Sequence, residues 1–205
     1  MPDLSHEANL RREGFQRIAG IDEAGRGPLA GPVSVAAVVL PEGYKNSVLN
    51  DSKVLSKKIR QKIYNEIIED ERIDWASVIV EASEIDRINI LKATWLGMRL
   101  AFLKLDPSAE IALIDGKPIQ GFPADHRALV KGDSLSLSIA AASVIAKVER
   151  DQLMREYAEI YPEYGFERHK GYGTKAHLEA LKRYGPCPIH RRSFAPVAQE
   201  EFDLS

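Results

Sequence analysis

An opening hairpin followed by alternating helices and strands limits the fold of this chain more than any other sequence feature. Residues 15–22 and 33–40 are rich in apolar and β-branched residues, as strands are. The connection between them contains residues that do not fit a helix, namely Pro28, Gly31 and Pro32. Later apolar segments predict three further strands, at residues 75–82, 110–116 and 126–131. This order predicts a mixed α/β fold in which helices pack against a five-stranded sheet.

Four helices are predicted between and after these strands. Ser56 is a good N-cap for the first helix, and Thr174 is a good N-cap for the last, which ends at Tyr184. Residues 84–105 predict one long helix, and the alanine-rich residues 135–157 predict another. The stripe that we expect the first of these two to bury consists of Ile85, Ile88, Leu91, Trp95, Leu96 and Leu100.

The length and composition are those of a globular protein with one main domain. The chain has 205 residues, of which 44% are hydrophobic, enough for a core in one domain with a small appendage. Its apolar runs are too short or too interrupted to span a bilayer, and residues 1–12 lack a signal-peptide hydrophobic region. We therefore expect a cytoplasmic protein without membrane contact. Cys187 is the single cysteine, which excludes a disulfide framework, and we expect an incidental thiol in a turn.

Positive charge is concentrated towards the C-terminus. The net charge of −2 argues against a protein that coats nucleic acid non-specifically. Residues 167–193 nevertheless hold seven lysines and arginines against two acids, together with three of the five histidines. We expect this region to hold a polyanion that a separate acidic centre cuts.

Four carboxylates each lie beside a glycine at the end of a predicted strand: Asp22, Glu23, Asp115 and Asp133. Strand ends of an α/β sheet lie close together when the strands are neighbours, and ligands bind in the crevice outside them. A cluster of like charges repels itself unless cations neutralise it, and Mg²⁺ and Mn²⁺ take oxygen ligands. The cluster therefore indicates two-metal phosphoryl transfer. Taken singly, these acids also fit a solvated loop, a turn at Asp115, or an N-cap at Asp133.

The pair Asp22 and Glu23 raises a geometric difficulty. Adjacent residues of a regular strand point to opposite faces, so both reach one metal pair only if the strand bulges or ends at Glu23. Under that condition we expect Asp22 to bridge the ions and Glu23 to be the more peripheral ligand.

A series of sequence blocks in order resembles bacterial ribonuclease HII over essentially the whole chain. The blocks are residues 20–28 (GIDEAGRGP), 51–53 (DSK), 115–116 (DG), 131–134 (KGDS), 140–148 (AAASVIAKV), 171–174 (GYGT) and 190–194 (HRRSF). The resemblance implies an RNase H-like fold with a mixed five-stranded sheet. It also implies a catalytic domain at residues 1–160 and a small helical, basic extension at residues 161–205 packed on it.

The same resemblance implies a metal-dependent endoribonuclease, a hydrolase that requires Mg²⁺ or Mn²⁺, with two ions per site. Its expected substrates are the RNA strand of RNA–DNA hybrids and ribonucleotides embedded in duplex DNA, incised on the 5′ side to leave a 3′-hydroxyl and a 5′-phosphate. We expect a monomer. A sliding clamp is a further candidate partner, with Phe202 and Leu204 as anchors, although a frayed tail fits the same residues.

The resemblance also implies roles for individual residues. The catalytic and metal-binding residues are Asp22, Glu23, Asp115 and Asp133. Gly25, Arg26 and Gly27 match the loop that reads the ribose 2′-hydroxyl, and Tyr172 matches a tyrosine that packs on the sugar. Glycine allows a close approach of the backbone, arginine forks to a phosphate, and the 2′-hydroxyl distinguishes RNA from DNA.

Other basic and polar residues have two open interpretations. Lys53, Ser143 and Lys147 are candidates for holding phosphate, or they are a surface or salt-bridged set without that role. Residues 190–192 either bind the substrate backbone or fold the tail back onto the domain.

Three other functions remain as alternatives. The glycines at positions 25, 27 and 31 depart from the dinucleotide-binding fingerprint, and a strand follows where that fingerprint requires a helix. A non-catalytic hybrid-binding protein has no need of four acids. Another two-metal DNA nuclease of the same fold would cut DNA that contains no 2′-hydroxyl.

Overall fold

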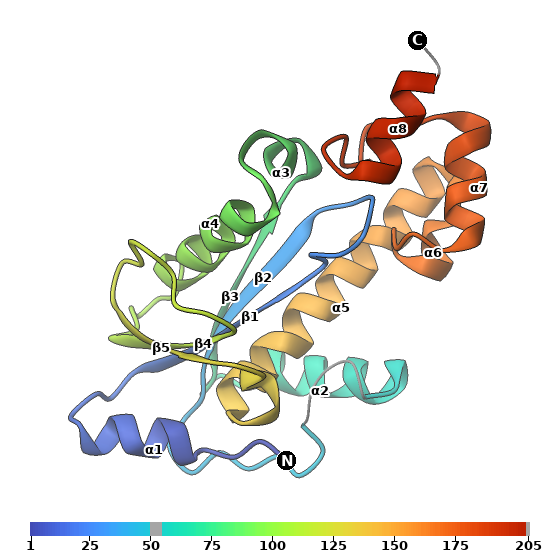
Figure 1. Ribbon diagram of the computed structural model, residues 1–205. Helices are drawn as coiled ribbons and strands as arrows, with labels where there is room; N and C mark the ends of the chain where they lie inside the picture. Colours follow the sequence, from blue (N-terminus) through green and yellow to red (C-terminus); the bar gives the residue numbers. More distant parts are fainter. Residues whose placement is uncertain (50–54, 204–205) are drawn as a thin grey trace.

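A mixed sheet of five strands lies at the centre of the computed structural model, which describes residues 1–49 and 55–203 (Figure 1). The strands are β1 (Ile18–Ala24), β2 (Val33–Val39), β3 (Asp74–Val80), β4 (Ile111–Asp115) and β5 (Asp125–Leu129). Their order across the sheet is β3-β2-β1-β4-β5. The β1–β2 and β2–β3 pairs are antiparallel, whereas β1–β4 and β4–β5 are parallel. The opening hairpin and the mixed sheet are therefore confirmed.

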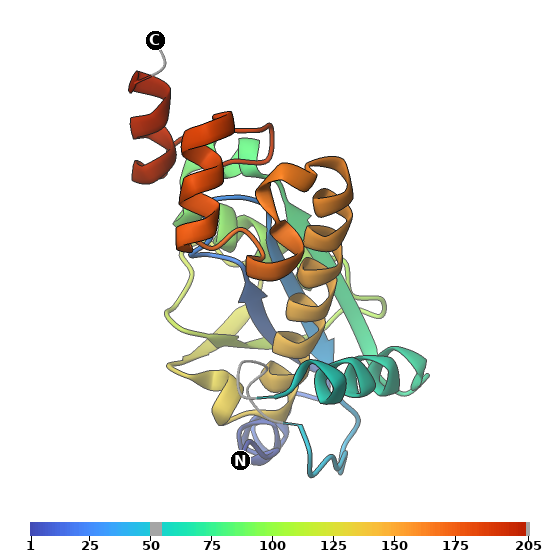
Figure 2. The same cartoon turned by 90° about the vertical axis from the view of Figure 1, so that its right-hand side faces the viewer.

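Helices cover both faces of this sheet. The long helix α5 (Leu137–Ile160) lies on one face and α4 (Ile90–Leu103) on the other (Figure 1). On β2, Ala36 and Val38 pack towards α5, while their neighbours in the strand pack towards α4. Figure 2 shows α2 (Lys57–Glu69) beside α5. The Ser56 hydroxyl accepts a hydrogen bond from the N–H of Ile59 at 3.3 Å, so the predicted cap is confirmed.

The predicted single helix over residues 84–105 is wrong. It is divided into α3 (Ala82–Ile88) and α4 at Asn89, whose φ is 69°. The Asn89 side chain accepts a hydrogen bond from the N–H of Lys92 at 3.1 Å and begins the second helix. Asparagine tolerates this left-handed conformation better than most residues do, and its short side chain caps helices well.

The predicted buried stripe of this region is also partly wrong. Leu91 and Leu100 are 44% and 43% exposed, whereas the face of α4 on the sheet contains Ala93, Gly97 and Ala101. A Cβ atom at Gly97 would lie 2.6 Å from Cγ2 of Val35 on β2. Because α4 lies so close to the strands, small residues face the sheet and several large ones face solvent.

The N-terminal helix α1 (Ser5–Arg12) packs against the start of α5. Glu7 is buried there and accepts hydrogen bonds from the Ser136 hydroxyl at 2.6 Å and the Ser138 N–H at 3.1 Å. Ser136 is the N-cap of α5, since its hydroxyl accepts from the N–H of Ile139 at 3.2 Å. The interpretation of Asp133 as the cap of this helix is therefore wrong.

The C-terminal part consists of short helices around the far end of α5 (Figure 1). They are η2 (Pro162–Tyr164), α6 (Phe166–His169), α7 (Lys175–Tyr184) and α8 (Ala195–Asp203). The Thr174 hydroxyl accepts from the N–H of His177 at 3.3 Å, which confirms the predicted cap of α7. Tyr164 and Phe166 share a hydrophobic cluster with Met154 of α5 and Ala30 of the β1–β2 connection. A boundary at residue 160 stays a prediction, because this cluster joins both sides of it.

Among the described helices, none combines the length and the apolar character that a membrane-spanning helix needs.

Candidate active site

Three of the four predicted acids meet at one edge of the sheet. Asp22 and Glu23 are near the end of β1, and Asp115 is the last residue of β4. One carboxylate oxygen from each of the three lies within 4.8 Å of the other two. Such a group of oxygens matches the donor set that hard divalent cations prefer.

The strand does not bulge or end at Glu23, contrary to the expectation from sequence. β1 keeps a continuous antiparallel register with β2 from Ala19↔Val39 to Ala24↔Ser34. Its parallel pairing with β4, however, stops at Ile21↔Ile114. Beyond that pair the β4 side of β1 is open, which leaves room for the long Glu23 side chain to bend towards Asp22 and Asp115. The sheet therefore brings the acids together by ending one strand before the other.

Asp22 lies in surroundings that disfavour its charge. The residue is only 2% exposed. Burial raises its pKa well above the ordinary value, and the negative charges of Glu23 and Asp115 raise it further. A hydrogen bond from Ser143 and the N–H of Glu23, 2.7 Å from Oδ1, act in the opposite direction. Its buried Oδ2 has no hydrogen-bond partner among the described residues. An unpartnered oxygen on a buried carboxylate that lies close to two other acids fits a bound cation.

Asp133 stands outside this group of three. It is buried in the turn η1 (Gly132–Ser134), after the end of β5. The N–H of Gly132, the preceding residue, donates to Oδ1 of Asp115 at 2.6 Å. The turn that carries Asp133 is thus hydrogen-bonded to Asp115, one of the three acids.

A cleft of about 230 Å³ adjoins the acids and contains most of the predicted substrate-binding residues. It is lined by Glu23, Ala24, Gly25, Arg26, Gly27, Lys147 and Tyr172. Arg26 Nη1 lies 3.2 Å from Oε1 of Glu23, and the Tyr172 side chain is 45% exposed. A Cβ atom at Gly27 would lie 3.7 Å from Cε1 of Tyr172. The glycine-rich loop and the tyrosine therefore form adjacent walls of one cleft.

The three candidates for holding phosphate have different surroundings. Lys147 lines this cleft but pairs with Asp151, with Nζ 2.7 Å from Oδ1. Ser143 is buried and forms a hydrogen bond with Asp22, and it is not among the residues that line the cleft. Lys53 lies outside the described residues. The phosphate-holding role stays a prediction for all three.

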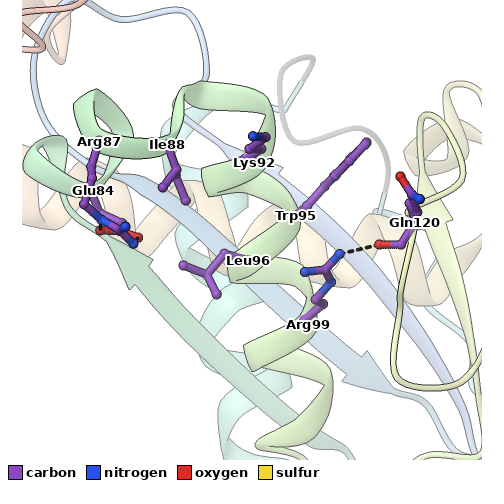
Figure 3. A pocket seen from close by; sticks show the side chains of 8 residues that line it. All are labelled: Glu84, Arg87, Ile88, Lys92, Trp95, Leu96, Arg99 and Gln120. Atoms are coloured by element: carbon purple, nitrogen blue, oxygen red, sulfur yellow. Dashed lines mark hydrogen bonds and ion pairs between the residues drawn. The ribbon is translucent and has the colours of Figure 1, made fainter.

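Two further clefts lie along α4, and one of them adjoins the acids. The cleft that adjoins the acids has a volume of about 460 Å³, and its lining includes Glu23, Asp115, Arg26, Lys117 and Trp95. Trp95 also lines a neighbouring cleft of about 410 Å³. Figure 3 shows this second cleft, in which Trp95, Lys92 and Arg99 project from α4 and the Arg99 guanidinium donates to the carbonyl of Gln120. The helical pattern placed Trp95 in the core, so sequence reasoning missed this surface.

Sequence reasoning also missed the burial of two arginines behind the glycine-rich loop. Arg191 and Arg150 are fully buried and donate hydrogen bonds to carbonyls of the β1–β2 connection. The open question about residues 190–192 is thereby answered for His190 and Arg191, which fold the tail back onto the domain. Cys187 lies in the expected turn but is buried, with Sγ 3.1 Å from Nδ1 of His190.

Comparisons of the sequence and of the structure with known proteins point to the same family. The family model described as Ribonuclease HII matches residues 19–197. A ribonuclease HII of Endomicrobium trichonymphae is 52% identical over 195 residues, which cover 95% of this chain and 92% of the relative. The crystal structure of the ribonuclease H2 from Pyrococcus horikoshii OT3 is 27% identical with a TM-score of 0.75, covering 92% of this chain and 98% of that one. An Archaeoglobus fulgidus RNase HII, solved in complex with PCNA, is 25% identical with a TM-score of 0.72 and covers 87% and 95%.

Proposed function

Because the chain belongs to the ribonuclease HII family, we propose that it incises duplex DNA on the 5′ side of embedded ribonucleotides. As a member of that family it is a ribonuclease H, a hydrolase that acts on RNA–DNA hybrids and depends on divalent metal ions. The proposed incision leaves a 3′-hydroxyl and a 5′-phosphate. The observation that carries this proposal is the cleft in which Glu23 adjoins Gly25, Arg26, Gly27 and Tyr172.

We infer that Asp22, Glu23 and Asp115, with Asp133 nearby, hold two Mg²⁺ or Mn²⁺ ions. Such ions activate the attacking water and stabilise the leaving oxygen when they are bound. Asp22 is the expected bridging ligand, because it is the most buried of the three and its Oδ2 has no other described partner. Glu23 also contacts Arg26, so it joins the metal-binding acids to the substrate-reading loop.

Recognition of the ribose is assigned to Gly25, Arg26, Gly27 and Tyr172. The absence of side chains at the two glycines lets a sugar approach the backbone. The exposed Tyr172 ring offers an apolar surface against which a sugar can pack. A 2′-hydroxyl in this cleft would lie beside Glu23, and hence close to the phosphate that is cut.

A clamp-type partner is a further proposal. The Archaeoglobus fulgidus relative forms a complex with PCNA. The proposed anchors in this chain, Phe202 and Leu204, lie outside the described side chains. Removal of residues 199–205 should abolish binding to a sliding clamp without changing the incision of a ribonucleotide-containing duplex in the absence of the clamp. We further expect a monomer, which light scattering would test.

The decisive experiment compares a DNA duplex containing one ribonucleotide with its all-DNA control, with and without Mg²⁺ or Mn²⁺. We expect metal-dependent cutting of the first duplex only, at the 5′ side of the ribonucleotide. Cutting of both duplexes would indicate a DNA nuclease of the same fold. Binding without cutting of either would indicate a non-catalytic hybrid-binding protein.

A further inference from the structure

The C-terminal residues 187–191 contact the glycine-rich loop directly and reach Tyr172 through His177. This segment runs alongside the β1–β2 connection, with an antiparallel bridge between Ala30 and His190. The Gly31 N–H donates to the Ile189 carbonyl, and the Arg191 N–H donates to the Leu29 carbonyl, both at 2.8 Å. The segment is therefore attached by its backbone to the base of the glycine-rich loop.

The Arg191 guanidinium holds the loop itself. Arg191 is fully buried, and its acceptors are main-chain carbonyls. Nη2 donates to Gly25 at 2.5 Å and to Pro32 at 3.1 Å, while Nη1 donates to Arg26 and Nε to Gly31, both at 2.9 Å. A buried cation is costly unless it is hydrogen-bonded, so these carbonyls stay turned towards the guanidinium. Burial lowers the pKa of Arg191 to about 9, which still leaves it charged at neutral pH.

This arrangement determines the direction of two N–H groups. In a trans peptide the C=O and N–H point in opposite directions. With the carbonyls of Gly25 and Arg26 directed at Arg191, the N–H groups of Arg26 and Gly27 point away from it. Neither donates to a backbone carbonyl among the described residues. Both belong to residues that line the cleft, where such donors suit the oxygens of a ribose or a phosphate.

A chain of imidazoles holds the other element, Tyr172. The Tyr172 carbonyl lies 2.9 Å from His177 Nδ1, and His177 Nε2 lies 3.0 Å from His190 Nε2. The N–H of Cys187 donates to His190 Nδ1 at 3.0 Å, so that nitrogen carries no proton. His190 must then donate through Nε2 to His177, and His177 must donate through Nδ1 to Tyr172. The hydrogen-bond pattern fixes one tautomer for each ring.

We propose that residues 187–191 are a positioning device for ribonucleotide recognition. Arg191 orients the loop of Gly25 and Arg26, and His190, acting through His177, holds the backbone of Tyr172. These are positioning residues, since neither is exposed to a substrate. The inference rests on the proposed function, in which the loop and Tyr172 read the ribose.

The test uses Arg191→Lys in the full-length protein. A lysine keeps the charge, but its single ammonium group cannot reproduce the planar fork that serves four carbonyls. The measured quantity is the ratio of the dissociation constants for the all-DNA duplex and for the duplex with one ribonucleotide, by fluorescence anisotropy in EDTA. We expect Arg191→Lys to reduce this ratio by about tenfold, the effect of losing hydrogen bonds to a charged group. The matched control is Arg72→Lys, an exposed arginine paired with Asp70 near the opposite end of β2.

The outcomes separate this inference from the proposed function. A wild-type protein that binds both duplexes equally but cuts only the one with a ribonucleotide would overturn the positioning role alone, and one that neither binds nor cuts selectively would overturn both. A wild-type preference that persists in folded Arg191→Lys would overturn only the positioning role. If that variant does not fold, the tautomers decide: nitrogen NMR of the wild-type imidazoles should find the proton on Nδ1 of His177 and on Nε2 of His190. The opposite tautomers would contradict the proposed series of hydrogen bonds from His190 through His177 to Tyr172.

Discussion

At the scale of the single residue, Asp22 shows how the site favours a cation. Burial raises the pKa of its carboxyl group, and the nearby charges of Glu23 and Asp115 raise it further. Two hydrogen bonds only partly compensate, and Oδ2 has no described partner. The free protein therefore contains a local repulsion that a divalent ion would turn into an attraction.

Replacing Asp22 by asparagine should separate activity from stability. We expect Asp22→Asn to lower the single-turnover incision rate at least ~10³-fold, because loss of a metal ligand removes several kcal/mol of transition-state stabilisation. In EDTA the same variant should melt at or above the wild-type temperature, because it removes a buried negative charge. The control Asp125→Asn changes an exposed acid at the start of β5 and should keep the wild-type rate. Unchanged incision by Asp22→Asn would rule out the metal-binding assignment.

The buried imidazoles His177 and His190 should make stability depend on pH. Burial lowers the pKa of each from 6.5 to about 4. The unfolded protein takes up a proton at each imidazole near pH 6.5, whereas the folded protein does so only near pH 4. The stability is therefore complete above pH 6.5 and falls as the pH drops towards 4. Between these limits the free energy of unfolding should fall by roughly 1.4 kcal/mol per pH unit for each imidazole. When the free energy of unfolding is measured in urea from pH 7 to pH 4, its slope against pH should be shallower for His177→Asn than for wild type. Equal slopes would contradict this explanation.

Single residues differ in how far their sequence reveals their role. That Asp22, Glu23 and Asp115 would lie close together was predictable, because they follow apolar segments and come shortly before a glycine. The role of Arg191 was not, since an arginine in a basic, proline-rich stretch normally lies in solvent. Its burial depends on carbonyls about 160 residues earlier in the chain, such as that of Gly31, and no local pattern encodes that contact.

At the scale of the elements, the close approach of β1 and α5 sets the position of the site. Gly20 of β1 faces the first turn of α5, where an added Cβ would lie 2.1 Å from the carbonyl carbon of Ser138. The obstructing atoms are backbone, which cannot rotate away. The same helix carries Ser143 beside Asp22, and η1 with Asp133 directly precedes it. The spacing of this strand and helix therefore controls the distance between the acids.

Gly20→Ala should consequently destabilise the protein by roughly 3 kcal/mol, at the upper end of the usual cost of overpacking. Gly43→Ala is the comparison, because nothing lies within 4 Å of its added Cβ and only the positive φ of 70° adds strain. That strain should cost about 1 kcal/mol. Urea unfolding measures both values, and a Gly20→Ala variant as stable as Gly43→Ala would mean that α5 can move away freely.

The elements also show where sequence patterns reach their limit. Strands and caps were predictable because alternation and residues such as Ser56 and Thr174 act locally. The break at Asn89 was missed because apolar residues continue at helical spacing on both sides of it. The inward face of α4 was missed because hydrophobic patterns rank residues by size, whereas the distance between helix and sheet selected Gly97.

At the scale of the whole molecule, the acids lie between two surfaces that carry positive charge. On one side Lys92 and Arg99 project from α4 around Trp95 (Figure 3). On the other side α7 begins with Lys175, three residues after Tyr172. A duplex is much larger than the ribose cleft, so a substrate held at the acids would extend over at least one of these surfaces.

The salt dependence of binding should identify the surface that the substrate follows. Each phosphate contact that is lost reduces the slope of log affinity against log salt concentration by about one. We expect Lys92→Gln and Lys175→Gln each to reduce this slope for a hybrid duplex, measured by anisotropy in EDTA. Lys62→Gln is the control, because this lysine lies on α2 and, like Lys175, pairs with a glutamate four residues later. An unchanged slope for Lys175→Gln alone would exclude the start of α7 from the path and leave α4 as the surface that guides the substrate to the acids.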